Sequence, residues 1–321
     1  MGFLSMLTGA PGPNGYGFST TAEQVTEGID ATNLTIIITG GAKGLGLETA
    51  KVLAQKGAHV IIAARNTDAA NASRQQILEE NKDARIDVHK LDLLSISSIH
   101  EFVRNFNALH LPLNVLINNA AVAFCPFQTT EYGTESQFAT NHLGHFLLTK
   151  LLLENMKETA KTSGIQGRIV ILTSIAHRFS YKEGIRFEKI NDQKRYSNLT
   201  AYNQSKLANL LHARELSRRL KMEDANVTVN SVHPGLISTD IFQDARIVFG
   251  LIKLISFPIW KNLSQGVATI CHAAIHPSLE GVSGEYLVDC NVMEPHKIAK
   301  DKALAKSLWD FSEKLVAGAL N

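Results

Sequence analysis

An apolar, β-branched run that breaks into glycines and then into a helical pattern is the feature that most constrains this fold. Leu34 to Thr39 (LTIIIT) has the composition of a strand buried on both faces, and Glu48 to Gln55 carries strong helix formers. Between them lie Gly40, Gly44 and Gly46. A Cβ there would hold a pyrophosphate away from the backbone N–H groups and from the positive end of the helix. The segment therefore predicts strand, phosphate-binding turn and helix, with a dinucleotide as the expected ligand.

The spacing of these glycines leaves an alternative open. It is G-x-x-x-G-x-G rather than G-x-G-x-x-G, and glycines between a strand and a helix also form plain tight turns. A Walker-type phosphate loop is disfavoured because Leu47 and Glu48 follow Gly46, where that motif needs Lys and Ser or Thr.

Beyond this unit, strand and helix patterns alternate along a chain of 321 residues that is 45% hydrophobic, enough for a sizeable core. The alternation predicts an α/β, single-domain Rossmann fold with a seven-stranded, mostly parallel, doubly wound sheet, whose ligand crevice lies at the carboxyl ends of the strands. Strands are expected at 34–39, 58–64, 86–91, 115–117, 168–173, 227–232 and 285–288, and helices at 48–55, 68–80, 95–109, 131–156, 201–221, 265–275 and 301–316.

Residues 1–33 read as an N-terminal extension, and residues 34–321 as the dinucleotide-binding and catalytic domain. No Lys or Arg precedes Lys43, which argues against a secretory or organelle-targeting leader, so we expect a cytoplasmic, non-cleaved chain. A net charge of +2 gives no reason to expect nucleic acid as a partner. The three cysteines lack metal-ligand spacing, so we expect unpaired thiols and no metal.

One apolar segment lies late in the chain. Ile247 to Trp260 (IVFGLIKLISFPIW) is interrupted by Lys253 and Pro258, and no uninterrupted apolar run reaches the length of a membrane span. We interpret residues 240–262 as an apolar lid over a pocket, with surface contact to a membrane as the alternative. A lid of this kind favours a lipophilic substrate.

Polar residues follow several of the expected strands, at the sheet edge where ligands bind. Arg65 stands at the position where an acid would hold the ribose hydroxyls of NAD(H). Together with Lys43 it favours the 2′-phosphate of NADP(H). The alternative is that Arg65 only ends a strand in solvent. Asp92 fits an adenine amino group or the start of a helix. Asn118 to Ala120 fits close approach of a nicotinamide ribose or ordinary turn chemistry.

Three further residues carry the expected chemistry. Ser174 closes the fifth strand after Thr173, and Tyr202 and Lys206 lie one turn apart on the same face of a helix. A nearby ammonium is expected to lower the pKa of the Tyr202 phenol, while Ser174 holds the carbonyl or alcohol oxygen. Alone, Y-x-x-x-K is more typical of a half-buried aromatic beside a solvated charge; the glycine turn and the strand-end serine strengthen the catalytic interpretation.

The ordered motifs resemble those of the short-chain dehydrogenases/reductases. They are Thr39-Gly40-x-x-x-Gly44-x-Gly46, LDL around Asp92, Asn118-Asn119-Ala120, Asn141 in NHLGHF, Ser174, Tyr202-x-x-x-Lys206 and His233-Pro234-Gly235 with Thr239. The resemblance implies a catalytic tetrad of Ser174, Tyr202, Lys206 and Asn141, the last supporting a water-linked proton relay from Lys206. The cofactor residues are then Gly40, Lys43, Gly44, Leu45, Gly46, Arg65, Asp92, Leu93, Asn119, Ala120, Ala121, Thr173, Tyr202, Lys206, Pro234, Gly235, Ile237 and Thr239.

The chain departs from that family between Ser174 and Tyr202, whose separation of 28 positions is longer than usual and makes 176–200 an insertion beside the expected pocket. Within the family, STTAEQVTEGID, TSIAH and SKLANLLHARELSRRL are similar to a branch with retinol dehydrogenases, WW-domain oxidoreductases and a plant plastid-envelope protein ascribed to the import translocon. That group is also described with a calmodulin-binding tail, to which residues 300–321 are comparable; a docked terminal helix is the alternative.

Two hypotheses follow. The first is an NADP(H)-dependent carbonyl reductase or alcohol dehydrogenase acting on a lipophilic ketone, aldehyde or alcohol. The second is an NADP(H)-binding redox sensor within a protein complex such as the plastid import machinery, with the plastid envelope as its location. Helical dimer or tetramer seams are common in the resembled family, which implies a homo-oligomer that the residues themselves do not show.

Overall fold

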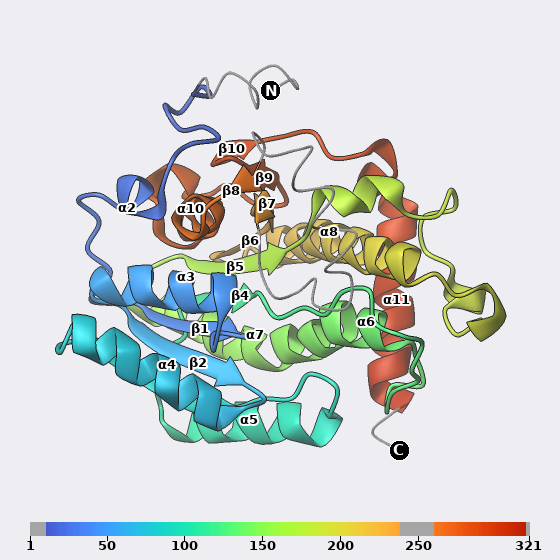
Figure 1. Cartoon of the computed structure of the whole chain (residues 1–321), viewed down its shortest axis with the longest axis horizontal. Helices are drawn as coiled ribbons and strands as arrows, with labels where there is room; N and C mark the ends of the chain where they lie inside the picture. Colours follow the sequence, from blue (N-terminus) through green and yellow to red (C-terminus); the bar gives the residue numbers. More distant parts are fainter. Residues whose placement is uncertain (1–10, 238–259, 319–321) are drawn as a thin grey trace.

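A twisted eight-stranded sheet forms the centre of the computed structural model, which describes residues 11–237 and 260–318 (Figure 1). The strand order is β10-β9-β6-β5-β4-β1-β2-β3, and neighbours pair in parallel except β9 with β10. The strands are β1 (Thr35–Thr39), β2 (His59–Ala64), β3 (Arg85–Lys90), β4 (Val115–Asn118), β5 (Gly167–Leu172), β6 (Val227–His233), β9 (Tyr286–Val288) and β10 (Asn291–Val292). Because β1 lies between β2 and β4, the strand order reverses at the glycine turn, which confirms the doubly wound fold.

The sheet has eight strands where the sequence predicts seven. The additional strand, β10, folds back on β9 through Asp289 and Cys290, which both have positive φ (51° and 62°). Two consecutive left-handed residues form the turn that suits a two-residue hairpin. Because such turns usually contain Asn or Gly, an Asp-Cys pair gave no hairpin signal. A separate parallel pair, β7 (Leu236–Ile237) and β8 (Trp260–Lys261), lies beyond β6.

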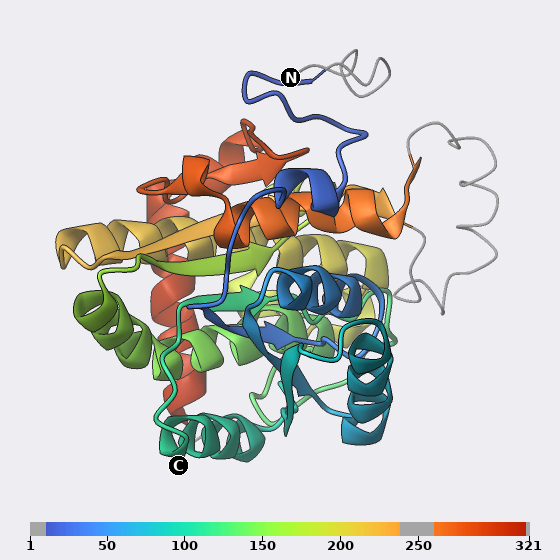
Figure 2. The same ribbon diagram turned by 90° about the vertical axis from the view of Figure 1, so that its left-hand side faces the viewer.

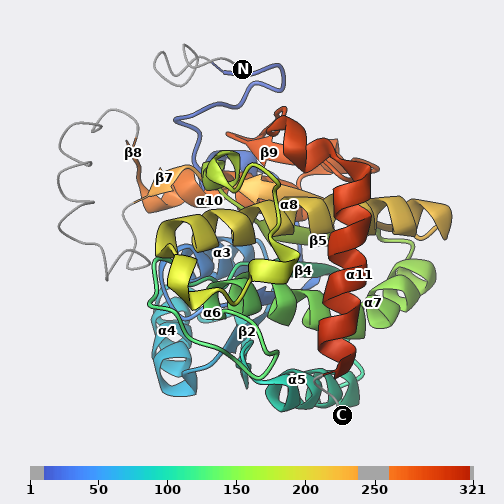
Figure 3. The same ribbon diagram turned by 90° about the vertical axis from the view of Figure 1, so that its right-hand side faces the viewer.

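Helices cover both faces of the sheet. On β1, Ile37 packs into one core with α5, α7, α8 and α11, whereas Ile36 and Ile38 pack into the other with α2, α3, α4 and α10. Figures 1 and 3 show these two helical layers. The helices are α2 (Ala22–Val25), α3 (Gly44–Gln55), α4 (Thr67–Glu80), α5 (Ile96–Ala108), α6 (Ser136–Phe138), α7 (Gly144–Ser163), α8 (Asn198–Met222), α10 (Leu263–Ile275) and α11 (Lys302–Gly318).

The helix predicted at 131–156 begins later and is not uniform. Residues before Glu135 form a turn, and the buried Glu135 carboxylate caps α6 by accepting from the N–H groups of Gln137 (2.8 Å) and Phe138 (3.0 Å). A π-helical turn, η1 (Ala139–Leu143), then joins α6 to α7. π-Turns within helices are frequent at functional sites, and this one contains Asn141.

The insertion at 176–200 contains three short 3₁₀ turns. They are η2 (Ile175–Phe179), η3 (Phe187–Lys189) and η4 (Gln193–Arg195). η2 packs beside α8, so the insertion follows the strand end that carries Ser174 and returns to the start of α8.

The described part of the N-terminal extension packs onto α10 (Figure 2). Ala22 and Val25 are buried, and the Ala22 N–H donates to Ser264 Oγ at 3.2 Å. The Tyr16 ring meets His272 and His276 edge-on, with 5.6 Å between centroids in each pair. Residues 16–25 therefore contribute to the core on this face of the sheet.

The C-terminal helix α11 lies across α8 (Figure 3). Leu308 and Val316 are buried, Ser312 Oγ lies 2.8 Å from His142 Nε2, and the Arg219 guanidinium stands 4.2 Å from the Trp309 ring centroid. The apolar face of α11 is thus occupied by its own fold. Among the described residues, no helix combines the length and apolar character that a membrane crossing requires.

Candidate active site

The glycine turn after β1 is shaped by close packing. Gly40 and Gly44 have positive φ (67° and 56°), and a Cβ on Gly46 would collide with the Gly40 carbonyl oxygen and stand 2.7 Å from Asn119 Nδ2. Asn119 Nδ2 itself donates to the Thr39 carbonyl at 2.8 Å. Glycine is therefore required at position 46 because α3 packs against the Gly40 carbonyl in the turn after β1 and against Asn119 at the end of β4, contacts that the sequence alone did not reveal.

The start of α3 keeps its backbone N–H groups free of a side-chain cap. Lys43 is the N-cap residue, and its side chain makes no capping hydrogen bond. Unsatisfied N–H groups at a helix N-terminus together with the helix dipole form a site suited to phosphate. Leu45 lies in this first turn, where its side chain and that of Ile237 both approach Gly266 of α10.

Two cations stand exposed at this edge. Arg65 follows β2, and Lys43 precedes α3; neither belongs to an ion pair within residues 11–237 and 260–318. The next residue, Asn66, caps α4 by accepting from the Ala69 N–H at 3.0 Å. Arg65 is therefore not needed for the cap and stays available to a ligand.

The end of β3 is partly engaged by its own turn. Asp92 Oδ1 accepts from the Leu94 N–H at 3.0 Å, as expected of an Asp that leads into a helix. The residue is half-buried. Leu93 is buried, and its carbonyl packs against Gly144, where a Cβ would collide with it.

The segment after β4 is held from two sides. Thr39 Oγ1 accepts from the N–H groups of Asn119 (2.9 Å) and Ala120 (3.0 Å). Asn141 clamps Val122, because its Oδ1 accepts from the Val122 N–H and its Nδ2 donates to the Val122 carbonyl, both at 2.9 Å. Residues 119–122, with half-buried Ala121 between the two anchors, are thereby fixed beside the glycine turn.

Three members of the predicted tetrad meet where β5 ends against α8. Thr173 Oγ1 donates to the Lys206 carbonyl at 2.7 Å, and Lys206 Nζ lies 3.3 Å from the Leu172 carbonyl. Ser174 follows at the start of η2, and its side chain lies close enough to the Tyr202 phenol to lower the pKa of that group. The fourth member, Asn141, reaches α8 by donating from Nδ2 to Ser205 Oγ at 2.9 Å, one residue before Lys206.

Burial dominates the electrostatics of this cluster. It raises the pKa of Tyr202 to about 12, against a smaller lowering effect of the Ser174 side chain, and it lowers the pKa of Lys206 to about 8. Lys206 Nζ lies 5.6 Å from the Tyr202 ring centroid. The expected lowering of the phenol pKa by the ammonium does not occur in the protein alone, where burial raises this pKa and Lys206 does not lower it.

Phe124, which packs against Tyr202, was missed by sequence reasoning. Their ring centroids are 5.3 Å apart, and Phe124 has a left-handed backbone, with φ at +59°. Two amides hold it: Gln137 Oε1 accepts from the Phe124 N–H at 2.7 Å, and Asn198 Nδ2 donates to its carbonyl at 3.1 Å. A bulky residue in this conformation is strained, and such strain clusters at functional sites.

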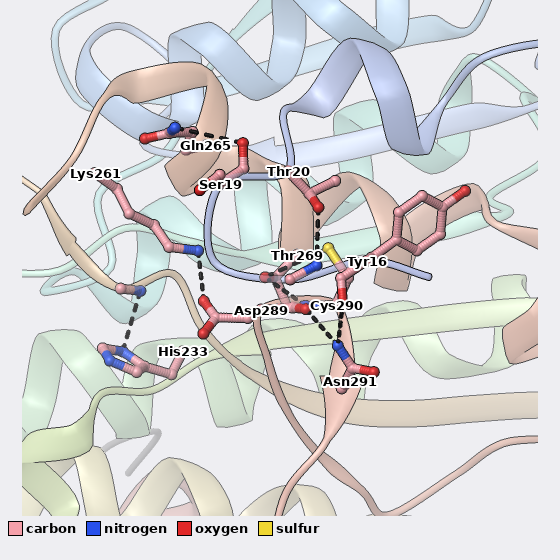
Figure 4. A network of polar contacts seen from close by, with 12 residues as sticks. Tyr16, Ser19, Thr20, His233, Lys261, Gln265, Thr269, Asp289, Cys290 and Asn291 are labelled. Carbon is pink, nitrogen blue, oxygen red and sulfur yellow. Dashed lines mark hydrogen bonds and ion pairs between the residues drawn. The ribbon is translucent and has the colours of Figure 1, made fainter. Parts of the chain in front are cut away.

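The segment after β6 turns sharply over a buried ion pair (Figure 4). Gly235, after Pro234, has φ at +95°, and a Cβ there would stand 2.7 Å from Lys261 Cδ. Lys261 Nζ pairs with Asp289 Oδ1 at 2.5 Å, and both side chains are almost fully buried. Figure 4 shows the pair between His233 and the N-terminal segment. Thr239 and most of the predicted lid, residues 238–259, lie outside the described residues.

The N-terminal segment and α10 are hydrogen-bonded to the β9–β10 hairpin, which carries Asp289. Asn291 Nδ2 donates to the Tyr16 carbonyl at 3.0 Å, and the Cys290 N–H donates to Thr269 Oγ1 at 3.1 Å (Figure 4). The backbone that holds Asp289 is therefore supported by residues from two distant parts of the chain, the N-terminal segment and α10.

Comparison with known proteins agrees with this arrangement. Residues 34–187 match the family model described as short chain dehydrogenase. The chain is 58% identical over 316 residues to "Short-chain dehydrogenase TIC 32 B, chloroplastic" of Brassica napus, covering 98% of this chain and 99% of that protein. It is 41% identical to "Retinol dehydrogenase 12" of Mus musculus, covering 91% of this chain and 89% of that protein.

A solved structure of an uncharacterized protein from Mycobacterium paratuberculosis superposes with a TM-score of 0.73 at 31% identity, covering 93% of this chain and 98% of that one. The likeness to retinol dehydrogenases and to the plant group, predicted from sequence, is confirmed. The chain belongs to the short-chain dehydrogenase/reductase family of NAD(P)-binding oxidoreductases.

Proposed function

We propose that this protein is an NADP(H)-dependent oxidoreductase that interconverts a lipophilic ketone or aldehyde with its alcohol. The observation that carries the proposal is the meeting of Ser174, Tyr202 and Lys206 at the end of β5. Parallel strands end at one edge of the sheet, so this cluster shares its edge with the glycine turn after β1. A phenol, a hydroxyl and an ammonium beside a nucleotide-binding turn suit hydride transfer coupled to proton transfer.

The residues present fit a dinucleotide phosphate. The uncapped start of α3 suits the pyrophosphate, and Lys43 and Arg65 are exposed cations for a 2′-phosphate. When bound, the nicotinamide supplies or accepts the hydride. Asn119 and Ala120 would border its ribose, and Pro234 to Ile237 its ring.

The side chains divide the remaining chemistry among them. The Ser174 hydroxyl hydrogen-bonds the substrate oxygen and orients it toward Tyr202. With its pKa raised to about 12, the Tyr202 phenol is protonated at neutral pH, which suits it to give its proton to a carbonyl oxygen in the direction of reduction. Lys206, with its pKa lowered to about 8, can return a proton near neutral pH, and Asn141 lies next to α8 to support that path.

Apolar side chains pack beside the cluster. Ala123, Phe124 and Tyr202 form a small buried group of their own, with Ala176 packed against it. Phe179 and Leu199 are 67% and 53% exposed, on η2 and the first turn of α8. Apolar walls around a few polar groups are the usual form of a small-molecule site, and they favour a lipophilic substrate.

The experiment that tests this function is turnover of the Tyr202→Phe variant. We expect the wild type to consume NADPH with members of a panel of lipophilic ketones and aldehydes, and Tyr202→Phe to lose that activity without losing NADPH binding. Tyr181→Phe, a phenol stacked on Arg186 rather than on a tetrad residue, is the matched control and should keep activity. A wild type that binds NADPH tightly but oxidises none of it with any substrate contradicts the proposal.

Cofactor preference is tested separately. Arg65→Asp should shift preference from NADP(H) toward NAD(H), because a carboxylate repels the 2′-phosphate and accepts from ribose hydroxyls. Arg104→Asp, an exposed arginine on α5, is the control for charge alone. Equal affinity of the wild type for both dinucleotides would contradict the assignment.

A second candidate is an NADP(H)-binding redox sensor in a plastid protein complex. It is favoured by the Brassica napus relatives, whose names include TIC 32 and chloroplastic. The same names favour the plastid over the cytoplasm as the location to test, by following a fluorescent fusion in plant cells. Tight NADPH binding with no turnover, and accumulation of the fusion at chloroplasts, would support the sensor over the enzyme.

A further inference from the structure

Two buried histidines approach the backbone carbonyls of tetrad residues. His145 Nδ1 lies 3.2 Å from the Asn141 carbonyl oxygen, and its Nε2 lies 2.8 Å from Thr39 Oγ1. His177 Nδ1 lies 2.7 Å from the Ser174 carbonyl oxygen. Both rings are at most 2% exposed. The tetrad itself leaves these contacts unexplained, because neither imidazole is one of its members.

The protonated nitrogen of His177 follows from its second partner. The His296 backbone N–H lies 3.1 Å from His177 Nε2, and a backbone N–H can only donate. Nε2 therefore accepts, and a neutral ring carries its proton on Nδ1. His177 thus donates to the Ser174 carbonyl and joins it to the backbone before α11.

The protonated nitrogen of His145 follows from Thr39. The Thr39 hydroxyl already accepts from the N–H groups of Asn119 and Ala120, which uses both of its lone pairs. Its own proton must then be donated, and His145 Nε2 at 2.8 Å is a closer acceptor than the Ile117 carbonyl at 3.4 Å. His145 Nε2 therefore accepts, and Nδ1–H donates to the Asn141 carbonyl.

Both assignments require neutral rings, and burial provides them. It lowers the pKa of His145 to about 4, with a further lowering by the Lys206 charge, and it lowers the pKa of His177 to about 4, with Arg178 and His296 acting in the same direction. At neutral pH each ring thus has one donor and one acceptor, and each of these has a partner.

We propose that His145 and His177 are positioning residues for the tetrad, each fixing one backbone carbonyl through its Nδ1–H. His145 holds Asn141 in the π-turn and links it, through Thr39, to the glycine turn and to the end of β4. His177 holds Ser174 and links it to the segment before α11. This inference deepens the proposed function and rests on it. In the sequence this arrangement corresponds to one histidine four residues after Asn141 and another three residues after Ser174.

Asparagine and glutamine variants separate positioning from packing. An Asn amide nitrogen falls near the place of Nδ1 and keeps the donor to the carbonyl, whereas a Gln amide falls near Nε2 and loses it. We expect His145→Asn and His177→Asn to keep kcat within about threefold of the wild type. His145→Gln and His177→Gln should lower kcat about tenfold or more, which is the loss of one hydrogen bond, with the KM for NADPH unchanged.

His212 is the matched control. It is equally buried on α8, and its ring packs against Phe146 and Trp309 rather than against a tetrad residue. His212→Asn and His212→Gln should change kcat equally. If the Asn and Gln variants at 145 and 177 also behave alike, or if they lose folded protein while the remainder keeps wild-type kcat, the positioning role is overturned.

Nitrogen NMR of histidine-labelled wild type gives a readout that needs no substrate. We expect both rings to be neutral at pH 7 and protonated on Nδ1. A proton on Nε2 of either ring overturns the assignment for that ring, whatever the activity. A wild type without turnover refutes the proposed function, and the nitrogen spectrum then still decides the hydrogen bonds.

Discussion

Replacing Lys206 with Met should stabilise the ligand-free protein while abolishing its activity. The lysine is buried, and Nζ reaches only the Leu172 carbonyl, at 3.3 Å, with no carboxylate in an ion pair to it among the described residues. That carbonyl also accepts from Asn209 Nδ2 at 2.9 Å, so it keeps a partner when the ammonium is removed. Met has a similar length and no charge to desolvate.

The size of the effect follows from the pKa of Lys206. Burial lowers this pKa from 10.5 to about 8. At ~1.4 kcal/mol per pH unit, the folded state loses ~3 kcal/mol by holding the charged form at pH 7. Between pH 8 and 10.5 the unfolded chain binds more protons than the folded one, so the stability of the wild type rises with pH in that window.

Urea unfolding of the ligand-free proteins from pH 7 to pH 10 checks this. Lys206→Met should exceed the wild type by ~3 kcal/mol below pH 8, with the difference shrinking as pH rises toward 10.5. Lys306→Met, at an exposed lysine on α11, is the control and should show no such trend. A variant that is less stable than the wild type, or a difference that does not change with pH, would refute the reasoning.

Three further outcomes are expected. Gly46→Ala should weaken NADPH binding tenfold or more, measured by fluorescence titration, because its Cβ displaces α3 from Gly40; unchanged affinity would contradict this. Lys261→Met should cost ~3–5 kcal/mol in urea unfolding by leaving Asp289 buried and unpaired, and Asp289→Asn in the same chain should recover most of it; no recovery would locate the loss elsewhere. Phe124→Gly removes the aromatic ring but keeps a backbone that tolerates φ of +59°. The KM for large lipophilic carbonyls should therefore rise while the KM for small ones does not; an equal rise for both would argue against an apolar wall.

The sequence was sufficient to predict the features of the fold and of the family that depend on local residue patterns. The β-branched run before Gly40 and the alternation that follows predicted the doubly wound sheet, since these patterns record which side chains must be buried. The ordered motifs gave the family, because Ser174 follows the end of β5 and Tyr202 and Lys206 lie one turn apart on α8, at positions that the fold fixes. NADP(H) preference and the roles of the site residues remain predictions.

Only the tertiary structure decided what depends on contacts between distant segments. The eighth strand depends on two left-handed residues, Asp289 and Cys290. The N-terminal segment packs on α10, and the Phe124 ring packs against the Tyr202 ring. The pKa values of Tyr202 and Lys206 changed for the same reason. Solvation is lost when separate elements close over a side chain, and local sequence does not record which elements those will be.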